Sequence, residues 1–224
     1  MIIESASRKI NKAIKYAAQG YWPIRLHGVV NGYCTCGKLD CGSKGKHPNT
    51  KNGYLDATQN ESVIRRWFEE QPLSNIGIAP HEGIVAIDVD PKNGGDKTWA
   101  SWQAEFGEVA RTPQSRTGSG GYHYLLTLPP GIKVKNTANK VGAGVDLRTW
   151  GGLIVVEPSV TDKGPYSWLV PLSEPIAPCP DWLIEKIRVS KGFKEDPAKP
   201  QTPQTGRSEE HTSELSHTVN SYAV

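Results

Sequence analysis

Two aspartates separated by a single residue, Asp88 and Asp90, are the residues of this sequence best placed to do chemistry. They follow the apolar run 84–87 and precede Pro91 and an Asn-Gly-Gly turn. Side chains two apart on a strand point to the same side, so both carboxylates project together where the strand ends. Carboxylates this close repel each other unless positive charge lies between them, and a divalent cation commonly supplies it. The pair predicts a Mg²⁺ or Mn²⁺ site; the alternative is that one aspartate caps the turn and the other is solvated.

The elements that position this pair begin with residues 84–87, whose unbroken apolar character predicts a central strand buried on both faces. A strand at 75–79 leads into it, and Pro23 favours an edge position for the strand at 22–26. Helices are expected over residues 6–17, after a capping box from Thr58 to Glu61, after a cap at Asp96, and over 181–189. Further strands are expected at 111–117, 122–128, 144–150, 153–157 and 166–170. This order of elements predicts an α+β fold with a largely antiparallel or mixed sheet.

A glycine-rich loop, residues 115–121, precedes the strand that carries His123. Glycines let backbone N–H groups approach an anion, and Arg116 and His123 add positive charge, as a triphosphate requires. The alternative is a flexible hairpin loop. A third acid, Asp146, shares a strand face with Arg148, which fits either the same site or a surface salt bridge.

Four residues between positions 34 and 47 form a candidate metal site: Cys34, Cys36, Cys41 and His47. Three thiolates and an imidazole suit tetrahedral Zn²⁺. The surrounding segment, residues 34–48, has almost nothing to bury, so metal binding would supply the order that it lacks. Free thiols are the alternative.

The composition sets limits on the class of protein. A chain of 224 residues with a net charge of +3 has no strong overall field, so any basic site must be local. No signal peptide and no run of about 20 apolar residues is present, so we expect a cytoplasmic protein without membrane contact.

Three short motifs occur in order: acid-x-acid at Asp88-Val89-Asp90, small-x-His at Gly121-Tyr122-His123, and hydrophobic-acid at Val145-Asp146. With these motifs, residues 6–189 resemble the N-terminal domain of the bifunctional DNA primase/polymerase (prim-pol) family, in the archaeo-eukaryotic primase superfamily of plasmids, phages and mobile elements. Flanking segments extend the resemblance: Gly20-Tyr21-Trp22-Pro23, Gly45-Lys46-His47-Pro48, Asp56-Ala57-Thr58, Gly118 to His123, Asp146-Leu147-Arg148 through Gly151-Gly152, Glu157-Pro158-Ser159 and Gly164-Pro165-Tyr166. The sequence departs from the family at Gln114 to Thr117, where a shorter run is usual, so the phosphate-contacting residues stay open.

The resemblance implies an archaeo-eukaryotic primase-like core, an α/β N-terminal part joined to a modified RNA-recognition-type sheet. It implies template-directed nucleotidyl transfer by two cations, Mg²⁺ or Mn²⁺, held by Asp88, Asp90 and Asp146. His123 would act with them and would bind the nucleotide, as would Arg116, Ser119, Gly120, Gly121 and Arg148. The implied partners are a single-stranded DNA template, NTP or dNTP, and a downstream helicase domain or subunit. The implied setting is the cytoplasm of a bacterial, archaeal or phage-infected cell.

Two other functions use some of the same residues. A metal-dependent nuclease or relaxase also clusters acids and histidine, but the common relaxase pairs two histidines around one hydrophobic residue, and His123 has no such partner. A non-catalytic, zinc-containing nucleic-acid-binding module would not need three acids on one face. Products that depend on triphosphate and template separate the three hypotheses.

The domain organisation follows from composition. Residues 1–193 are expected to form the catalytic domain, with residues 34–48 as a zinc-binding insertion. Residues 194–224 are rich in Pro, Gln and Thr and predict a disordered linker. Within it, the run 207–215 reads like translated sequencing-adapter DNA, so part of this tail is interpreted as an artefact.

Overall fold

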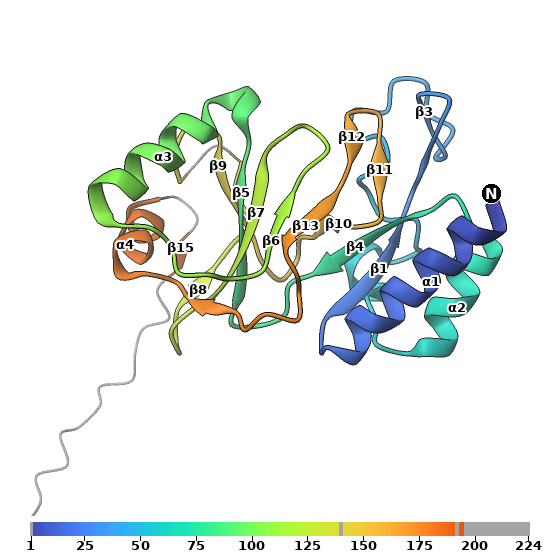
Figure 1. The fold of residues 1–224 in the computed structure, drawn as a ribbon, viewed down its shortest axis with the longest axis horizontal. Helices are drawn as coiled ribbons and strands as arrows, with labels where there is room; N and C mark the ends of the chain where they lie inside the picture. Colours follow the sequence, from blue (N-terminus) through green and yellow to red (C-terminus); the bar gives the residue numbers. More distant parts are fainter. Residues whose placement is uncertain (1, 139–140, 191–192, 195–224) are drawn as a thin grey trace, which may run out of the picture.

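The computed structural model describes residues 2–138, 141–190 and 193–194. Two β-sheets lie side by side, and each is covered at the outer end of the molecule by a pair of helices (Figure 1). The helices are α1 (Ile2–Ala18) and α2 (Glu61–Glu70) in one half, and α3 (Gly95–Phe106) and α4 (Asp181–Val189) in the other. Among the described helices, none combines the length and the apolar character needed to cross a bilayer.

The larger sheet has six strands in the order β13-β6-β7-β5-β9, with β14 beside β7. Its strands are β5 (Ile84–Val89), β6 (Gln114–Arg116), β7 (Tyr122–Thr127), β9 (Val145–Arg148), β13 (Ser167–Val170) and β14 (Ala177–Pro178). Every pairing is antiparallel except that of β14 with β7. The predicted α+β class with a mainly antiparallel sheet is confirmed.

Strand β5 is central, as its apolar run predicts, because it pairs with both β7 and β9. Ile84 and Ala86 belong to the core shared with α1 and α2, whereas Val85, Ile87 and Val89 pack toward α3 and α4. The alternation of side chains along a strand therefore places Asp88 on the same face as Ile84 and Ala86. This face is directed toward the smaller sheet.

The smaller sheet has three antiparallel strands in the order β1-β4-β10. They are β1 (Trp22–Leu26), β4 (Asn75–Ala79) and β10 (Ile154–Val156). The bounds of β4 agree with the prediction, and β1 lies at the edge, as Pro23 suggested. One face of this sheet contributes Ile76 and Ile78 to the core under α1 and α2, so the two halves share buried apolar contacts.

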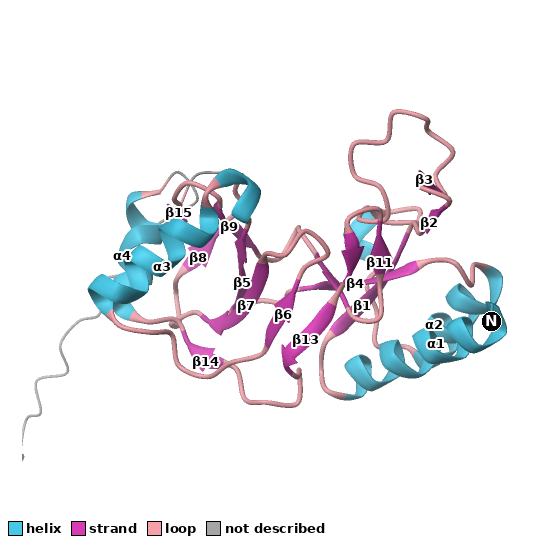
Figure 2. Cartoon of the chain, turned by 45° about the horizontal axis from the view of Figure 1, so that its top comes forward, coloured by secondary structure: helices cyan, strands magenta, loops and turns pink. Residues whose placement is uncertain are grey.

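Short two-stranded ribbons complete the fold: β2 (Val29–Val30) with β3 (Tyr33–Cys34), β11 (Val160–Thr161) with β12 (Gly164–Pro165), and β8 (Lys133–Val134) with β15 (Phe193–Lys194). The loops around β2 and β3 project from the half that contains the smaller sheet (Figure 2). Strand β15 ends at Lys194. Of the expected tail, residues 194–224, all but Lys194 lie outside the described residues.

Two predicted helix starts are wrong. The N-cap of α2 is Asn60, whose Oδ1 accepts a hydrogen bond from Val63 N–H at 3.2 Å. Thr58 does not cap the helix: its Oγ1 accepts from Asn60 N–H at 3.1 Å, and its own N–H donates to Pro23 O, which ties it to β1. At α3 the 3₁₀ turn η2 (Pro91–Asn93) runs directly into the helix, so Gly94 takes the N-cap position and Asp96 lies in the first turn. A short 3₁₀ turn η1 (Gly53–Asp56) precedes α2.

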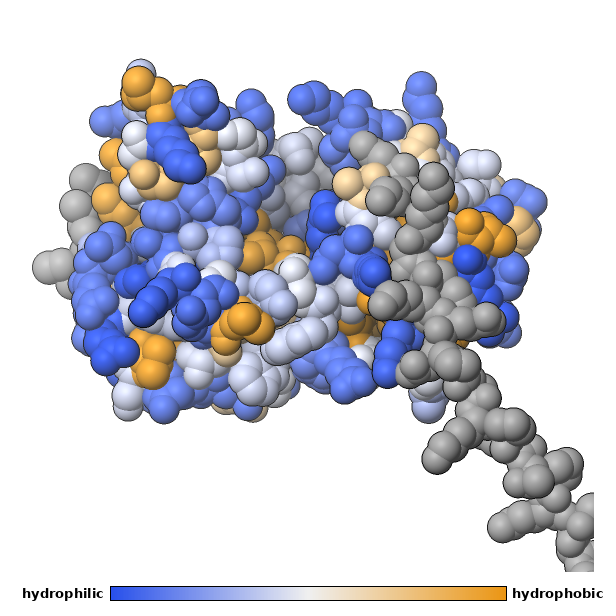
Figure 3. All heavy atoms as spheres, turned by 180° about the vertical axis from the view of Figure 1, so that it is seen from behind, coloured by the Kyte–Doolittle hydropathy of each residue, from blue (hydrophilic) through white to orange (hydrophobic). Residues whose placement is uncertain are grey.

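The strand predicted over residues 111–117 is shorter than expected, since only β6 (Gln114–Arg116) forms there. Pro113 has no backbone N–H and cannot donate a hydrogen bond to a neighbouring strand, so β6 begins only at Gln114. The helix at 181–189 agrees with the prediction residue for residue. Seen from behind, the surface is mainly hydrophilic, with small separate apolar groups and a hollow between the two halves (Figure 3).

Candidate active site

Three of the predicted site residues lie in one row across the larger sheet. Asp88 on β5 is directly opposite His123 on β7 and directly opposite Asp146 on β9. Ser115 on β6 continues the row, because it is opposite His123. Residues paired across antiparallel strands share a face of the sheet, so the pairing brings together three side chains that are 23 to 58 residues apart in the sequence.

Asp90 joins this row from the turn that follows β5. Its backbone N–H donates to Gly144 O at 2.8 Å, and its carbonyl accepts from Gly95 N–H at 2.9 Å. The first bond ties the turn to the residue before β9, and the second ties it to the first residue of α3. A side chain at Gly95 would place Cβ 2.2 Å from Gly144 O, so only glycine permits this approach.

The carboxylate of Asp90 caps the turn η2. It accepts hydrogen bonds from Lys92 N–H at 3.0 Å and from Asn93 Nδ2 at 2.7 Å. The capping interpretation of one aspartate is therefore correct for Asp90, yet the same side chain also lines the pocket beside Asp88. Capping and a place in the site are compatible because a carboxylate has lone pairs left after two hydrogen bonds.

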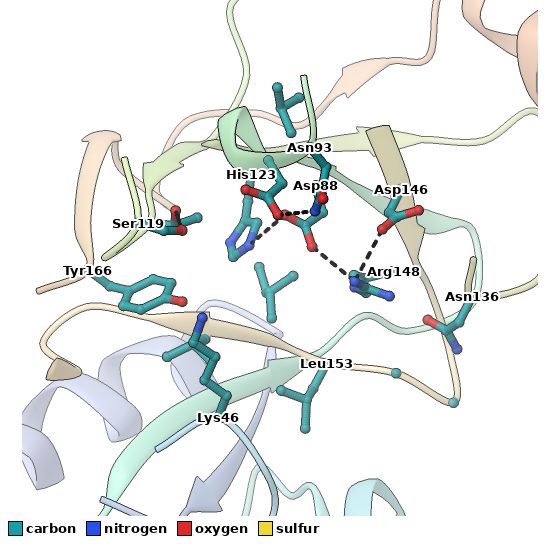
Figure 4. Close-up of a pocket in the computed structure, with 17 residues that line it drawn as sticks. Lys46, Asp88, Asn93, Ser119, His123, Asn136, Asp146, Arg148, Leu153 and Tyr166 are labelled. Atoms are coloured by element: carbon teal, nitrogen blue, oxygen red, sulfur yellow. Dashed lines mark hydrogen bonds and ion pairs between the residues drawn. The ribbon is translucent and has the colours of Figure 1, made fainter. Parts of the chain in front are cut away.

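The positive charge between the acids comes from Arg148. Its Nη2 lies 3.1 Å from Asp88 Oδ2 and 3.6 Å from Asp146 Oδ2 (Figure 4). The side chains of the two acids are 22% and 14% exposed, so this ion pair is largely withdrawn from solvent. The sequence left open whether Asp146 and Arg148 form a surface salt bridge, and the structure places their ion pair inside the pocket.

Thr137 holds both members of this bridge, a role that the sequence did not indicate. Its carbonyl accepts from Arg148 Nη1 at 2.8 Å, and its hydroxyl lies 3.3 Å from Asp146 Oδ1. The same hydroxyl accepts from Leu147 N–H at 2.9 Å, while Thr137 N–H donates to Leu147 O at 3.1 Å. No sequence motif indicates such a residue, because Thr137 contacts Arg148 and Asp146 only in the folded chain.

His123 is buried in this row between Ser115 and Asp88. Its Nδ1 lies 3.2 Å from Ser115 Oγ, and its Nε2 lies 3.6 Å from Asp88 Oδ1. Burial lowers the pKa of His123 from its ordinary value of 6.5; Asp88 opposes this shift, and the charges of Arg148 and Lys46 add to it. The imidazole is therefore neutral at pH 7, with one nitrogen donating and the other accepting.

These residues line a pocket of about 550 Å³, within the usual range for small-molecule sites. Ser119 and Thr117 reach it from the glycine-rich loop. Three residues expected to bind nucleotide do not line it: Arg116, Gly120 and Gly121. Arg116 is exposed because strand alternation turns it away from the face on which its neighbour Ser115 is buried. Gly121 instead packs on the end of β5, where a Cβ would lie 2.2 Å from Val89 O.

The opposite wall of the pocket includes two residues to which the sequence assigned no role, Lys46 and Tyr166. Both belong to segments that carry the family resemblance, which was the only signal for them. The ring of Tyr166 lies 6.1 Å from that of His123, centroid to centroid. Burial, and then the nearby carboxylates of Asp88, Asp162 and Asp90, raise the pKa of Tyr166, so its hydroxyl stays protonated.

The four predicted zinc ligands converge in the segment that follows β2. The ligand atoms of Cys34, Cys36, Cys41 and His47 all lie within 4.8 Å of one another. His47 Nε2 lies 3.4 Å from Cys34 Sγ and 3.5 Å from Cys41 Sγ, and all these thiols are free of disulfides. Within the described ranges this is the one group of three or more such side chains that converges in this way.

The charge state of Cys34 also suits a metal ligand. Burial acts to raise the pKa of its thiol, but hydrogen bonds from the backbone of Cys36 and Gly45, and from the side chains of Cys36 and His47, outweigh burial and lower the pKa to about 6. A thiolate is the form that binds metals. The cluster therefore has both the geometry and the chemistry of a Cys₃His site that could bind zinc.

The fold and the pocket define an α+β domain whose central sheet carries an acid–histidine site, with a separate Cys₃His cluster. The family model described as bifunctional DNA primase/polymerase, N-terminal, matches residues 13–182. The chain belongs to this family, which indicates an enzyme of the primase/polymerase kind, a nucleotidyltransferase. The comparison with curated proteins found no match.

Proposed function

We propose that this domain is a template-dependent nucleotidyltransferase, a DNA primase or polymerase that copies single-stranded DNA with NTP or dNTP. The observation that carries the proposal is the row of Asp88, His123 and Asp146 across three strands, with Asp90 beside it in the same pocket. A binding module has no need for three acids in one pocket. Family membership supports the reaction class, and the archaeo-eukaryotic primase-like details of the fold belong to the same proposal.

The donor set fits hard divalent cations. Asp88, Asp90 and Asp146 supply carboxylate oxygens, the ligands that Mg²⁺ and Mn²⁺ prefer. The acids already require positive charge, which Arg148 supplies between two of them. When bound, two such cations would lower the pKa of the attacking 3′-hydroxyl and neutralise charge on the reacting phosphates.

Side chains of the domain are already positioned in the pocket to contact a nucleotide. Ser115 holds neutral His123 in orientation through Nδ1, and the N–H on Nε2, 3.6 Å from Asp88 Oδ1, would be available to a phosphate oxygen once cations bind Asp88. The hydroxyls of Ser119 and Thr117 line the same pocket and add further donors. Arg148 is a second anchor, because its guanidinium becomes available for phosphate once cations replace it beside the acids.

We also propose that the Cys₃His cluster holds one structural zinc. The convergence of four soft and borderline ligands and the lowered pKa of Cys34 support this. Residues 34–48 contain one buried apolar side chain, that of the ligand Cys34 itself, so little else would order the segment. A setting in the replication of a phage, plasmid or mobile element, with a helicase domain or subunit as partner, is part of the same proposal.

A reaction with a single-stranded template tests the function. Reactions with and without a primer, with NTPs or dNTPs, and with Mg²⁺ or Mn²⁺, are resolved on a denaturing gel. Products whose sequence and length follow the template support the proposal. Cleavage of the template would favour a nuclease, and binding without products would favour a nucleic-acid-binding module.

A further inference from the structure

Lys46 reaches the candidate active site from the metal cluster and not from the catalytic sheet. Its side chain lines the pocket together with Asp88, His123 and Tyr166. Figure 4 shows Lys46 beneath Tyr166, on the side of the pocket opposite Asp88 and His123. The next residue in the chain is His47, one of the four members of the Cys₃His cluster. Adjacent residues therefore belong to the two candidate functional centres.

The pocket contains two Lys or Arg side chains, and their charges are used differently. Arg148 is committed to Asp88 and Asp146. Lys46 makes no ion pair or side-chain hydrogen bond with any residue in the described part of the chain. Its charge does reach the site, because it is among the causes that lower the pKa of His123, after burial. A lysine without an acidic partner, facing a polar pocket, is suited to an anionic ligand.

The backbone on both sides of Lys46 is fixed closely. Gly45 O accepts from Asn75 Nδ2 at 3.0 Å, and Gly45 N–H donates to the Cys34 sulfur. Gly45 has φ +72°, and a Cβ there would lie 2.9 Å from Val29 Cγ2, so this position requires glycine. On the other side, His47 O accepts from His27 N–H at 2.9 Å.

The Cys₃His cluster helps to fix the backbone at Lys46 through both neighbouring residues, Gly45 and His47. Cys34 contacts Gly45 through its sulfur, and His47 contacts Cys34 and Cys41 through Nε2. Without a metal, these contacts are weak hydrogen bonds among thiols and an imidazole. A bound metal would replace the contacts among Cys34, Cys41 and His47 with coordination bonds, which would fix these ligands and, through Gly45 and His47, the residue between them.

We propose that Lys46 binds the phosphates of the incoming nucleotide and that the Cys₃His cluster, with its metal, is the element that positions Lys46. The inference rests on the proposed function, since it assigns a phosphate contact within that same pocket. The cluster is then more than a stabiliser of a surface loop, because its occupancy controls nucleotide affinity.

Binding of dATP tests the inference without chemistry. Affinity is measured by calorimetry with Ca²⁺ in place of Mg²⁺, for the wild-type domain, Lys46→Met and the matched control Lys38→Met. Lys38 lies in the same segment, is exposed and does not line the pocket. Loss of a charge-assisted contact is expected to weaken dATP binding about tenfold or more in Lys46→Met. Lys38→Met should bind dATP like wild type, and both variants should keep wild-type zinc content and affinity for single-stranded DNA.

The role of the metal is tested with Cys36→Ser and with the double variant Cys36→Ser/Lys46→Met. Zinc content is measured by elemental analysis and folding by circular dichroism. Cys36→Ser should lose zinc and weaken dATP binding by about the same factor as Lys46→Met, and the double variant should be no weaker than either single variant. If Cys36→Ser does not fold, wild-type protein stripped with a zinc chelator at 4 °C replaces it.

The outcomes separate this inference from the proposed function. The inference is overturned if Lys46→Met, or folded protein without zinc, binds dATP with wild-type affinity. It is also overturned if the loss of dATP affinity in the double variant is the product of the losses in the two single variants. A loss confined to single-stranded DNA affinity in Lys46→Met also overturns it and assigns Lys46 to the template. If wild-type protein binds dATP through Lys46 but incorporates no nucleotide, the inference stands and the polymerase proposal fails.

Discussion

Replacing Arg148 with methionine is expected to destabilise the protein without divalent cations and to make those cations more stabilising. The substitution keeps an extended side chain but removes the charge between Asp88 and Asp146. The substitution also removes the hydrogen bond that Arg148 Nη1 donates to Thr137 O at 2.8 Å. The two acids are then left facing each other across paired strands.

The magnitude follows from how far these groups are buried. The side chain of Arg148 is 29% exposed, and those of its partners are 22% and 14% exposed. Such a bridge lies between exposed pairs, which contribute about 0–1 kcal/mol, and buried pairs, whose disruption costs about 3–5 kcal/mol. We therefore expect a loss of about 2 kcal/mol, or roughly 4–8 °C in Tm for a domain of this size.

Thermal unfolding followed by circular dichroism, with and without Mg²⁺, measures this effect. The matched control is Arg65→Met, because Arg65 pairs with Glu61 at 2.6 Å while both side chains are about half exposed. The control should lose less than about 0.5 kcal/mol. Mg²⁺ should raise the Tm of Arg148→Met more than that of wild type, since a cation replaces the missing charge. Equal losses in both variants together with equal responses to Mg²⁺ would refute the reasoning.

Three further predictions concern the metal cluster, His123 and the tail. Elemental analysis of protein purified without added metal should find about one zinc per chain; absence of zinc together with freely reactive thiols at Cys34, Cys36 and Cys41 would contradict the site. Because burial lowers the pKa of His123 below 6.5, the unfolded chain binds a proton that the folded chain does not, so stability due to this group is lost as pH falls below about 6.5. Denaturant unfolding should therefore show that wild type loses more stability than His123→Gln between pH 7.5 and 5.5, and parallel losses would count against a buried neutral histidine. Removal of residues 195–224 should change Tm by less than about 2 °C, because a Pro-, Gln- and Thr-rich composition predicts little burial; a larger fall would show that the tail packs on the domain.

Much of the site's architecture was predictable because its information is local. The apolar run before Asp88 predicted a strand buried on both faces, and strand alternation placed Asp88 on one of those faces. The turn residues after it correctly predicted where the strand ends, next to Asp90. The spacing of cysteines and His47 predicted a cluster whose ligand atoms do converge.

The remaining features depend on contacts between distant residues, which composition and periodicity do not encode. Arg148 lies between two acids only because β9 pairs with β5 in one register, and a shift of one residue would turn it to the opposite face. The same alternation removes Arg116 from the pocket. Thr137 and Lys46 belong to no regular element, so only the folded chain shows that they reach the site.

The most direct test of the central claim is nucleotide incorporation by Asp88→Asn, Asp90→Asn and Asp146→Asn. Each change keeps side-chain volume and removes a charge that would hold a cation, and asparagine can still cap the turn at position 90. Loss of several kcal/mol of transition-state stabilisation should lower the incorporation rate by about a thousandfold or more, because each 1.36 kcal/mol is a factor of about ten.

The matched control is Asp96→Asn, an exposed aspartate outside the pocket that should retain the wild-type rate. Circular dichroism and single-stranded DNA affinity should show that all four variants fold and still bind template. Primer extension by the three site variants at near the wild-type rate would contradict the assignment of this row of acids as the catalytic centre.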